Sequence, residues 1–507
     1  MVHRGKLSAA CKPCRSRRLK CDQQKPSCSQ CIRGKRECGG YRDVDAMRVH
    51  DQTEEVMKKN SPSSHSSASS SSAAPQPQKR RMPRNNAVVL RQVSAPIADQ
   101  GTAFMLARWM DQGDVDGERG PVGTFIPQVI KTPSGRAVMA SLNATGLAAL
   151  SNIRMSQELM LSARQQYVTA LAETNAALSD QTQATSDATL VAVTFLGLYE
   201  LLTCNGPPLL DRYLTHLEGC TRLIELRGSD QLKDTIGLGL FTHFRTTIVL
   251  GGFWLKKPTP SFLFDLTKES FAYRGGSAQT DDELFLLIAK VGDLCARLRD
   301  GALIQPVKFV REALKLDAEL NAWAMGVEPR HRYTVLSVPK STDALTRYAS
   351  FRHIYGNTYH VYPDTVVSSW WSNYRFARLI LLELICWLCD HLARKNEETG
   401  AEYRQTYERS SVLSRQLAED VCASVPFQLG VSKESAMEDL KSPRTGGVVH
   451  LIWPLFIAAG SVGASPAMME WIIQCLFKIG HSVGIQQALV MSSSLLSGKD
   501  LNWLPDL

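Results

Sequence analysis

Six cysteines near the N-terminus constrain this chain more than any other feature of its sequence. They follow the spacing C-x2-C-x6-C twice, and each cysteine of the first triplet recurs 17 positions later. The six are Cys11, Cys14, Cys21, Cys28, Cys31 and Cys38. Three thiolates leave a tetrahedral zinc ion one ligand short, and two separate sites need more sulfur ligands than six cysteines supply. Two zinc ions therefore fit only if two cysteines bridge both.

Disulfide bonds are the alternative use of these cysteines. The N-terminus shows no apolar signal segment, and cysteine pairs at this short spacing in an intracellular chain favour metal binding. We therefore predict that the cofactor is zinc, with two ions bound by the six thiolates.

Cations fill the interval between the second and third cysteines. Arg15, Arg17, Arg18 and Lys20 fall within roughly one and a half helical turns, with Leu19 expected as an apolar anchor beneath them. Residues 1–50 hold 13 Lys+Arg and 4 Asp+Glu, a balance of +9. Six thiolates and two zinc ions offset about two of these charges. The remaining excess of about +7 favours a phosphate partner, which means nucleic acid.

The stretch ACKPCRSRRLKCDQQKPSCSQCIRGKREC, residues 10–38, resembles the fungal zinc binuclear cluster transcription factors. The resemblance implies a helix in the DNA major groove, a short helix at the start of each triplet, and Cys11 and Cys28 as the bridging ligands. Pro26 matches the family's loop proline, which is often cis. Arg18 stands where many relatives carry the lysine that reads guanines of a CGG triplet, and arginine can bond the same O6 and N7 atoms.

These features predict a DNA-binding domain over residues 8–42. Arg17 and Arg18 are expected to reach base edges from the middle of the recognition helix. Lys12, Arg15 and Lys20 are expected to contact phosphates. The partner is double-stranded DNA with CGG-type sites.

Residues 43–100 are expected to be a disordered linker rich in serine, proline and basic residues. The serine-rich stretch 60–78 has almost no apolar side chains to offset the entropy of ordering. Four cations after it, Lys79, Arg80, Arg81 and Arg84, suit a nuclear-import signal, an extra phosphate contact or a solvated linker. No clear coiled-coil heptad follows the cysteines, which leaves homodimer formation open.

Residues 101–507 are predicted to form a large all-α regulatory domain. Residues 101–137 look irregular, after which apolar residues recur at helical spacing. Ser186 and Asp281 are expected to start helices, and Gly228 and Gly301 to end them. The stretches at 213–228, 362–385 and 450–460 resemble the helical regulatory domain of many of these factors. The resemblance implies an activator or repressor whose body binds a metabolite or another protein. No membrane-spanning segment is expected.

Three other features have alternative interpretations. Cys386 and Cys389 suit core packing or a second metal site. Trp370 and Trp371 with Tyr374 suit the core or a ligand pocket. The C-terminal stretch 500–507 suits a packed terminal helix or a short acidic-hydrophobic activation motif.

Together these features predict a nuclear, zinc-dependent, sequence-specific regulator of RNA polymerase II transcription. Because no nucleophile, metalloprotease or phosphate-loop motif occurs, we do not expect an enzyme. The competing hypotheses are an enzyme that the zinc module tethers to DNA, and a zinc scaffold that binds proteins through its basic face.

Overall fold

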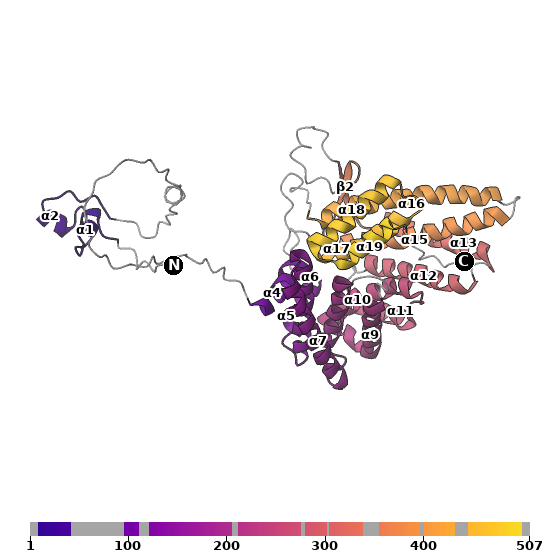
Figure 1. Cartoon of the computed structure of the whole chain (residues 1–507), viewed down its shortest axis with the longest axis horizontal. Coiled ribbons are helices and arrows are strands. Elements are labelled where there is room, and N and C mark those ends of the chain that lie inside the picture. The colour runs from indigo at the N-terminus through magenta and orange to yellow at the C-terminus, as the bar shows by residue number, and fades with distance from the viewer. Residues whose placement is uncertain are drawn as a thin grey trace, which may run out of the picture. The chain divides into compact units, whose positions relative to one another are not determined.

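The computed structural model describes residues 9–41, 96–110, 121–204, 211–274, 279–301, 304–337, 354–395, 400–430 and 445–498. The chain divides into two compact units, Met1–Leu90 and Arg91–Leu507 (Figure 1). The serine-rich stretch 60–78, the basic run after it and the stretch 500–507 lie outside the described residues, so the structure leaves those predictions untested.

The described residues of the N-terminal unit, 9–41, contain two short helices, α1 (Lys12–Ser16) and α2 (Ser29–Arg33). Each begins directly after a cysteine in extended conformation, Cys11 or Cys28. The buried cluster of this unit consists of cysteines, against which Tyr41 packs. A segment this small buries too little apolar surface to fold alone, which is the usual reason that such modules depend on a metal.

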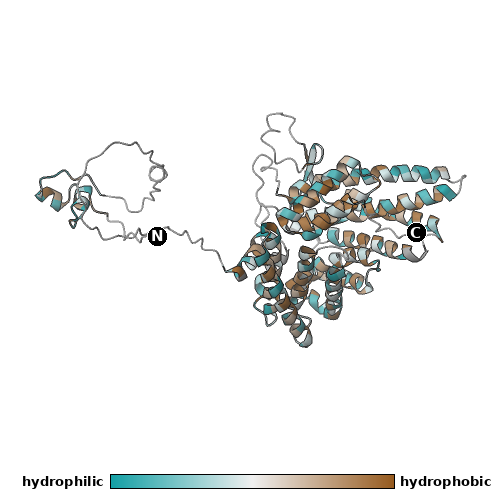
Figure 2. Cartoon of the chain, viewed as in Figure 1, coloured by the Kyte–Doolittle hydropathy of each residue, from teal (hydrophilic) through white to brown (hydrophobic). Residues whose placement is uncertain are grey.

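The second unit is built almost entirely from helices, as predicted. Figure 2 shows hydrophobic and hydrophilic residues side by side along most of them, the pattern of amphipathic helices around a shared core. The helices are α4 (Ile97–Met105), the π-helical turn η1 (Leu106–Met110), α5 (Pro121–Val129), α6 (Gly135–Arg154), α7 (Gln157–Ser179), α8 (Asp187–Thr203), α9 (Asp211–Arg227), α10 (Thr235–Leu255), α11 (Ser261–Ser270), α12 (Gln279–Gly301), α13 (Pro306–Gly326), α15 (Thr365–Lys395), α16 (Gly400–Gln428), α17 (Thr445–Gly460), α18 (Pro466–Val483) and α19 (Gln486–Leu496).

Short elements connect these helices. In the ranges that the structure describes, the 3₁₀ turns are η2 (Gly228–Leu232), η3 (Phe271–Tyr273) and η5 (Pro329–His331). Two strands, β1 (Thr334–Ser337) and β2 (Thr358–Val361), pair antiparallel, with Thr334 opposite Val361. The prediction of an all-α domain therefore holds for the described residues except for this two-stranded antiparallel sheet.

Most of the predicted helix ends are confirmed. The Ser186 hydroxyl accepts a hydrogen bond from the Thr189 amide and caps α8. Gly228 follows the last residue of α9 with a φ of 53°, and Gly301 ends α12. Asp281 is not the cap of α12, because that helix already begins at Gln279.

The prediction that residues 101–137 are irregular is wrong. Helical elements occupy most of this stretch, namely α4, η1, α5 and the start of α6. Gly101 on α4 and Gly146 on α6 allow these two helices to pack closely. A Cβ atom on Gly101 would lie 2.3 Å from Asn143 Oδ1, and one on Gly146 would lie 2.0 Å from the Gly101 carbonyl oxygen. α4 begins at Ile97, within the last residues of the linker predicted over 43–100.

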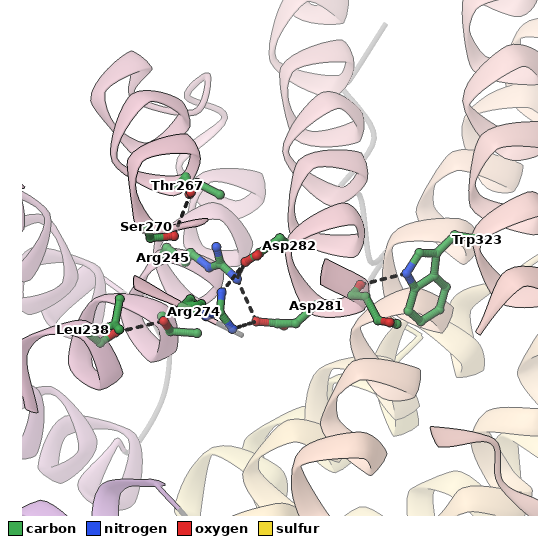
Figure 3. A network of polar contacts seen from close by, with 10 residues as sticks. Leu238, Arg245, Thr267, Ser270, Arg274, Asp281, Asp282 and Trp323 are labelled. Carbon is green, nitrogen blue, oxygen red and sulfur yellow. Dashed lines mark hydrogen bonds and ion pairs between the residues drawn. The ribbon is translucent and has the colours of Figure 1, made fainter. Parts of the chain in front are cut away.

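A buried ion network joins α10 to α12 (Figure 3). One Arg245 nitrogen, Nη2, lies 2.7 Å from Asp281 Oδ2 and 2.6 Å from Asp282 Oδ1. Arg274, just after η3, pairs with both carboxylates. The Arg245 guanidinium carbon also lies 4.7 Å from the Phe285 ring centroid. Burial raises the pKa of Asp282 against the opposing effect of the two arginines, which shows how much desolvation this network must offset.

One helix within the described ranges, α10, is long and apolar enough by length and composition to cross a membrane. That property is weak evidence, because core helices pass the same test. Arg245 lies near its middle, is fully buried and pairs with two aspartates of α12. Internal packing thus accounts for the apolar composition of α10.

The cysteine pair and the aromatic residues of α15, which had two interpretations each, pack against other residues of the helical body. Cys386 and Cys389 are both buried, and among the described residues neither belongs to a group of potential metal ligands. Trp371 and Tyr374 pack 5.5 and 5.4 Å from Trp323 between ring centroids. Trp370 packs edge-on against His331. The core interpretation therefore describes both the cysteine pair and the aromatic cluster.

Candidate metal centre and nucleic-acid interface

The six N-terminal cysteines converge on one small volume. Their sulfur atoms form two groups of four, and within each group all sulfurs lie within 4.8 Å of one another. One group is Cys11, Cys14, Cys21 and Cys28, and the other is Cys11, Cys28, Cys31 and Cys38. Four ligands is the number that a structural zinc site requires.

The sulfur spacing suits metal ligation rather than disulfide bonds. Cys11 Sγ lies 3.7 Å from both Cys28 Sγ and Cys31 Sγ, and 3.8 Å from Cys21 Sγ. A disulfide requires about 2.05 Å between sulfurs. Tetrahedral Zn–S bonds of about 2.3 Å place neighbouring sulfurs about 3.8 Å apart. The thiols are all free, and their spacing fits the edges of a zinc tetrahedron.

Cys11 and Cys28 belong to both groups. These are the two cysteines for which the resemblance implied a bridging role. The residues present thus fit a pair of metal ions that share two thiolates, and each ion would stabilise the fold by joining both halves of the module.

The electrostatics of the thiols also call for a cation. Burial raises the pKa of Cys31 to about 12, whereas backbone hydrogen bonds lower the pKa of Cys38 to about 7. Crowded buried thiols are therefore hard to ionise together without positive charge between them. A bound metal ion supplies that charge and holds the ligands as thiolates.

Two contacts outside the cysteines hold the halves of the module together. The Ser29 amide at the start of α2 donates to Asp22, at 3.1 Å from Oδ1 and 3.3 Å from Oδ2. The Tyr41 hydroxyl donates to the Gln24 carbonyl, and its ring packs on the cysteine cluster. The sequence did not predict these contacts of the Asp22 and Tyr41 side chains. Asp22 and Tyr41 lie close to ligands in the sequence, but this position does not identify a hydrogen-bond partner.

The Lys25–Pro26 peptide bond that joins the halves is cis, as the resemblance implied. This segment links Cys21, the last ligand of the first triplet, to Cys28.

The predicted DNA-contacting cations surround α1 but not in the expected positions. α1 ends at Ser16, so Arg17 caps the helix and Arg18 follows it in the left-handed region with a φ of 54°. The expectation that both project from the middle of a helix is therefore wrong. Leu19 is 44% exposed rather than a buried anchor, and its amide donates to the Cys14 carbonyl at 2.9 Å. Its backbone, not its side chain, holds the turn.

The exposure of these cations suits contact with a polyanion. Lys12 is the first residue of α1, and Arg15 lies in its last turn, half-buried. Arg17, Arg18 and Lys20 are exposed in the turn that leads to Cys21. In the described part of the module, no ion pair engages any of these five cations. A dense, accessible positive surface thus lies directly beside the metal ligands.

Comparisons with known proteins agree with this geometry. Residues 9–46 match the family model described as fungal Zn(2)-Cys(6) binuclear cluster domain. Residues 118–332 match the fungal specific transcription factor domain. The second match contains the stretch 213–228 and ends before the stretches at 362–385 and 450–460. The limits predicted for the domains, 8–42, 43–100 and 101–507, therefore stay predictions.

The chain is similar to several fungal regulators. The transcription factor dbaG of Emericella nidulans is 31% identical over 140 residues, which cover 26% of this chain and 31% of that protein. White-opaque regulator 2 of Candida albicans is 49% identical over 37 residues, which cover 7% of this chain and 8% of that protein. The matched stretches thus span less than two thirds of these relatives. No solved structure matches the chain significantly.

The fold and the site define a DNA-binding zinc-cluster module joined to a helical body. Both family models match, so the chain carries two domains of fungal transcription factors, a zinc binuclear cluster domain and a fungal specific transcription factor domain, and is similar to that class of protein. This class implies a role in regulation rather than catalysis.

Proposed function

We propose that the chain is a nuclear regulator of RNA polymerase II transcription that binds two zinc ions and reads CGG-type triplets in the major groove. The observation that carries this proposal is the pair of four-sulfur groups sharing Cys11 and Cys28, with an exposed run of cations directly beside them. A metal-held scaffold with a positive face is what reading of an anionic duplex requires.

Residue roles follow from charge and position. Arg18 occupies an exposed turn at the end of α1, where a guanidinium can approach a guanine edge and bond O6 and N7 together. Arg17, the preceding residue, also contacts base edges. Lys12, Arg15 and Lys20 lie on either side along the chain and contact backbone phosphates, which fixes the register of the module on the duplex.

The helical body controls output from the bound site. Its effector is a small molecule or another protein.

Selection from random duplexes tests the proposal. Full-length protein is incubated with randomised DNA at physiological salt, and bound duplexes are sequenced. We expect enrichment of CGG triplets that disappears when zinc is removed by a chelator. Enrichment of a single triplet would indicate monomeric binding, and enrichment of a spaced pair would indicate a dimer.

Two results would contradict it. If the bound pool showed no sequence preference at any salt concentration, the module would not be a sequence reader. If the chain bound proteins through its basic face and duplex DNA only weakly and without dependence on salt, the zinc-scaffold hypothesis would replace it.

A further inference from the structure

The two halves of the zinc module repeat each other in backbone geometry as well as in sequence. α2 begins and ends 17 residues after α1. The Leu19 amide donates to the Cys14 carbonyl at 2.9 Å, and the Arg36 amide donates to the Cys31 carbonyl at 3.0 Å. The turn that follows α1 therefore has a structural equivalent after α2.

The equivalence extends to an unusual backbone conformation. Arg18 has a φ of 54°, and Lys35, 17 residues later, has a φ of 48°. A side chain disfavours this region because its Cβ atom crowds the backbone, whereas glycine adopts it freely. Both halves nevertheless place a long cation there. Residues with a strained backbone conformation often lie at functional sites, where the side chain contacts a ligand.

The second turn carries its own positive charge. Arg33, Lys35 and Arg36 are exposed, and with Glu37 they sum to 3 − 1 = +2. The first turn, with four cations at 15, 17, 18 and 20, sums to +4. Six thiolates and two zinc ions sum to about −2, so the first turn alone exceeds the charge of the cluster. Neutralising the cluster therefore does not explain the second group of cations.

We propose that Arg33, Lys35 and Arg36 form a second contact site for the phosphate backbone of DNA. This inference rests on the proposed DNA binding by the first half and extends it to the second. Exposed cations on a turn favour the sequence-independent backbone, because phosphates carry full charge at every position of the duplex. The second half would then add affinity and leave the choice of sequence to the first half.

A charge-removing variant of the full-length chain tests the site. R33Q/K35Q/R36Q is titrated against a CGG duplex and a scrambled duplex at several salt concentrations. We expect weaker binding to both duplexes by the same factor, so that their ratio does not change. Each lost phosphate contact lowers the slope of log K against log salt by about 0.9, which predicts a total decrease of about 2 to 3.

Two further variants separate the loss of a phosphate contact from the effects of net charge and of misfolding. K131Q/R136Q/K268Q removes the same charge from exposed positions of the helical body and should leave the slope unchanged. Glu37→Gln removes the negative charge from the second turn and should tighten binding to both duplexes. Because a misfolded module cannot bind more tightly, this gain does not depend on the triple variant folding.

The outcomes are distinct. Unchanged affinity and slope in the triple variant, with its zinc content intact, would overturn the second site, as would an unchanged affinity of Glu37→Gln. A selective loss on the CGG duplex would also overturn it, since it would assign these residues to base reading. Lack of CGG preference in the unmodified chain would instead reject the proposed function.

Discussion

Arg18 and Arg15 lie on either side of the end of α1, and their substitutions should have different effects. If Arg18 bonds guanine O6 and N7, Arg18→Ala should cost about 1–3 kcal/mol on a CGG duplex and little on a scrambled one. Arg15→Ala should weaken binding to both duplexes alike and lower the salt slope by about one. Equilibrium titrations of both variants on both duplexes measure this. An unchanged ratio of affinities in Arg18→Ala would transfer the reading role to Arg17 or Lys12.

The bridging role of Cys28 can be tested in the same module. Cys28 belongs to both four-sulfur groups, whereas Cys38 belongs to one. Cys28→Ser should therefore impair both metal sites, and Cys38→Ser mainly one. Zinc content by native mass spectrometry is the measurement. Loss of a single zinc ion in both variants would remove Cys28 from the bridging position.

Glu383 on α15 connects three parts of the helical body. Its Oε1 accepts a hydrogen bond from the Ser414 hydroxyl at 3.0 Å and one from the Val462 amide at 3.1 Å. Burial raises the pKa of this carboxyl to about 7, against the opposite effect of these bonds. The folded state therefore holds the proton at pH values where the unfolded chain has lost it.

This shift predicts a pH dependence of stability. A raised folded-state pKa means that stability falls as pH rises from about 4.5 to about 7, the window between the ordinary and shifted pKa values. Glu383→Gln keeps an oxygen for both accepted bonds and removes the ionisation. We expect the variant to gain stability relative to the unmodified chain across that window, measured by urea unfolding at each pH. A stability difference that does not change with pH would contradict this.

At the scale of elements, an ion network with a fully buried arginine joins α10 to α12. Asp282→Ala removes one of two carboxylates from the fully buried Arg245. Loss of a partner from a buried charge costs about 3–5 kcal/mol, because the remaining charge stays desolvated. Urea unfolding should show this as a large decrease in midpoint.

A surface pair gives the matched control. Arg297 pairs with Glu312 between α12 and α13, with half of the arginine side chain exposed. Arg297→Ala should cost less than about 1 kcal/mol, because solvent screens exposed pairs. Equal losses in the two variants would mean that burial does not set the strength of the network.

At the scale of the whole molecule, the division into two compact units predicts that DNA binding and regulation separate. A fragment of residues 1–90 contains all six metal ligands and both basic turns and lacks the helices of the body. We expect it to fold on zinc and to prefer CGG duplexes, without the regulation that the body supplies. Band-shift titration compares it with the full chain. A fragment that binds zinc and shows no preference would mean that the body contributes to recognition.

The sequence by itself determined the metal site and the class of fold. Ligand spacing is a local property, so the repeat of cysteines was enough to predict two four-sulfur groups with shared members. Helical periodicity is also local, and it identified most helices from residue 147 onward together with the ends at Ser186, Gly228 and Gly301.

Tertiary structure decided what depends on partners distant in the chain. Gly101 lies in the stretch predicted to be irregular, but it faces a crossing helix that contains Gly146, and only the fold brings these two glycines together. The sequence predicted that Asp281 caps a helix. The structure instead shows that it pairs with Arg245, which is distant in the chain. Contacts of this kind depend on three-dimensional distance, which the order of residues along the chain does not specify.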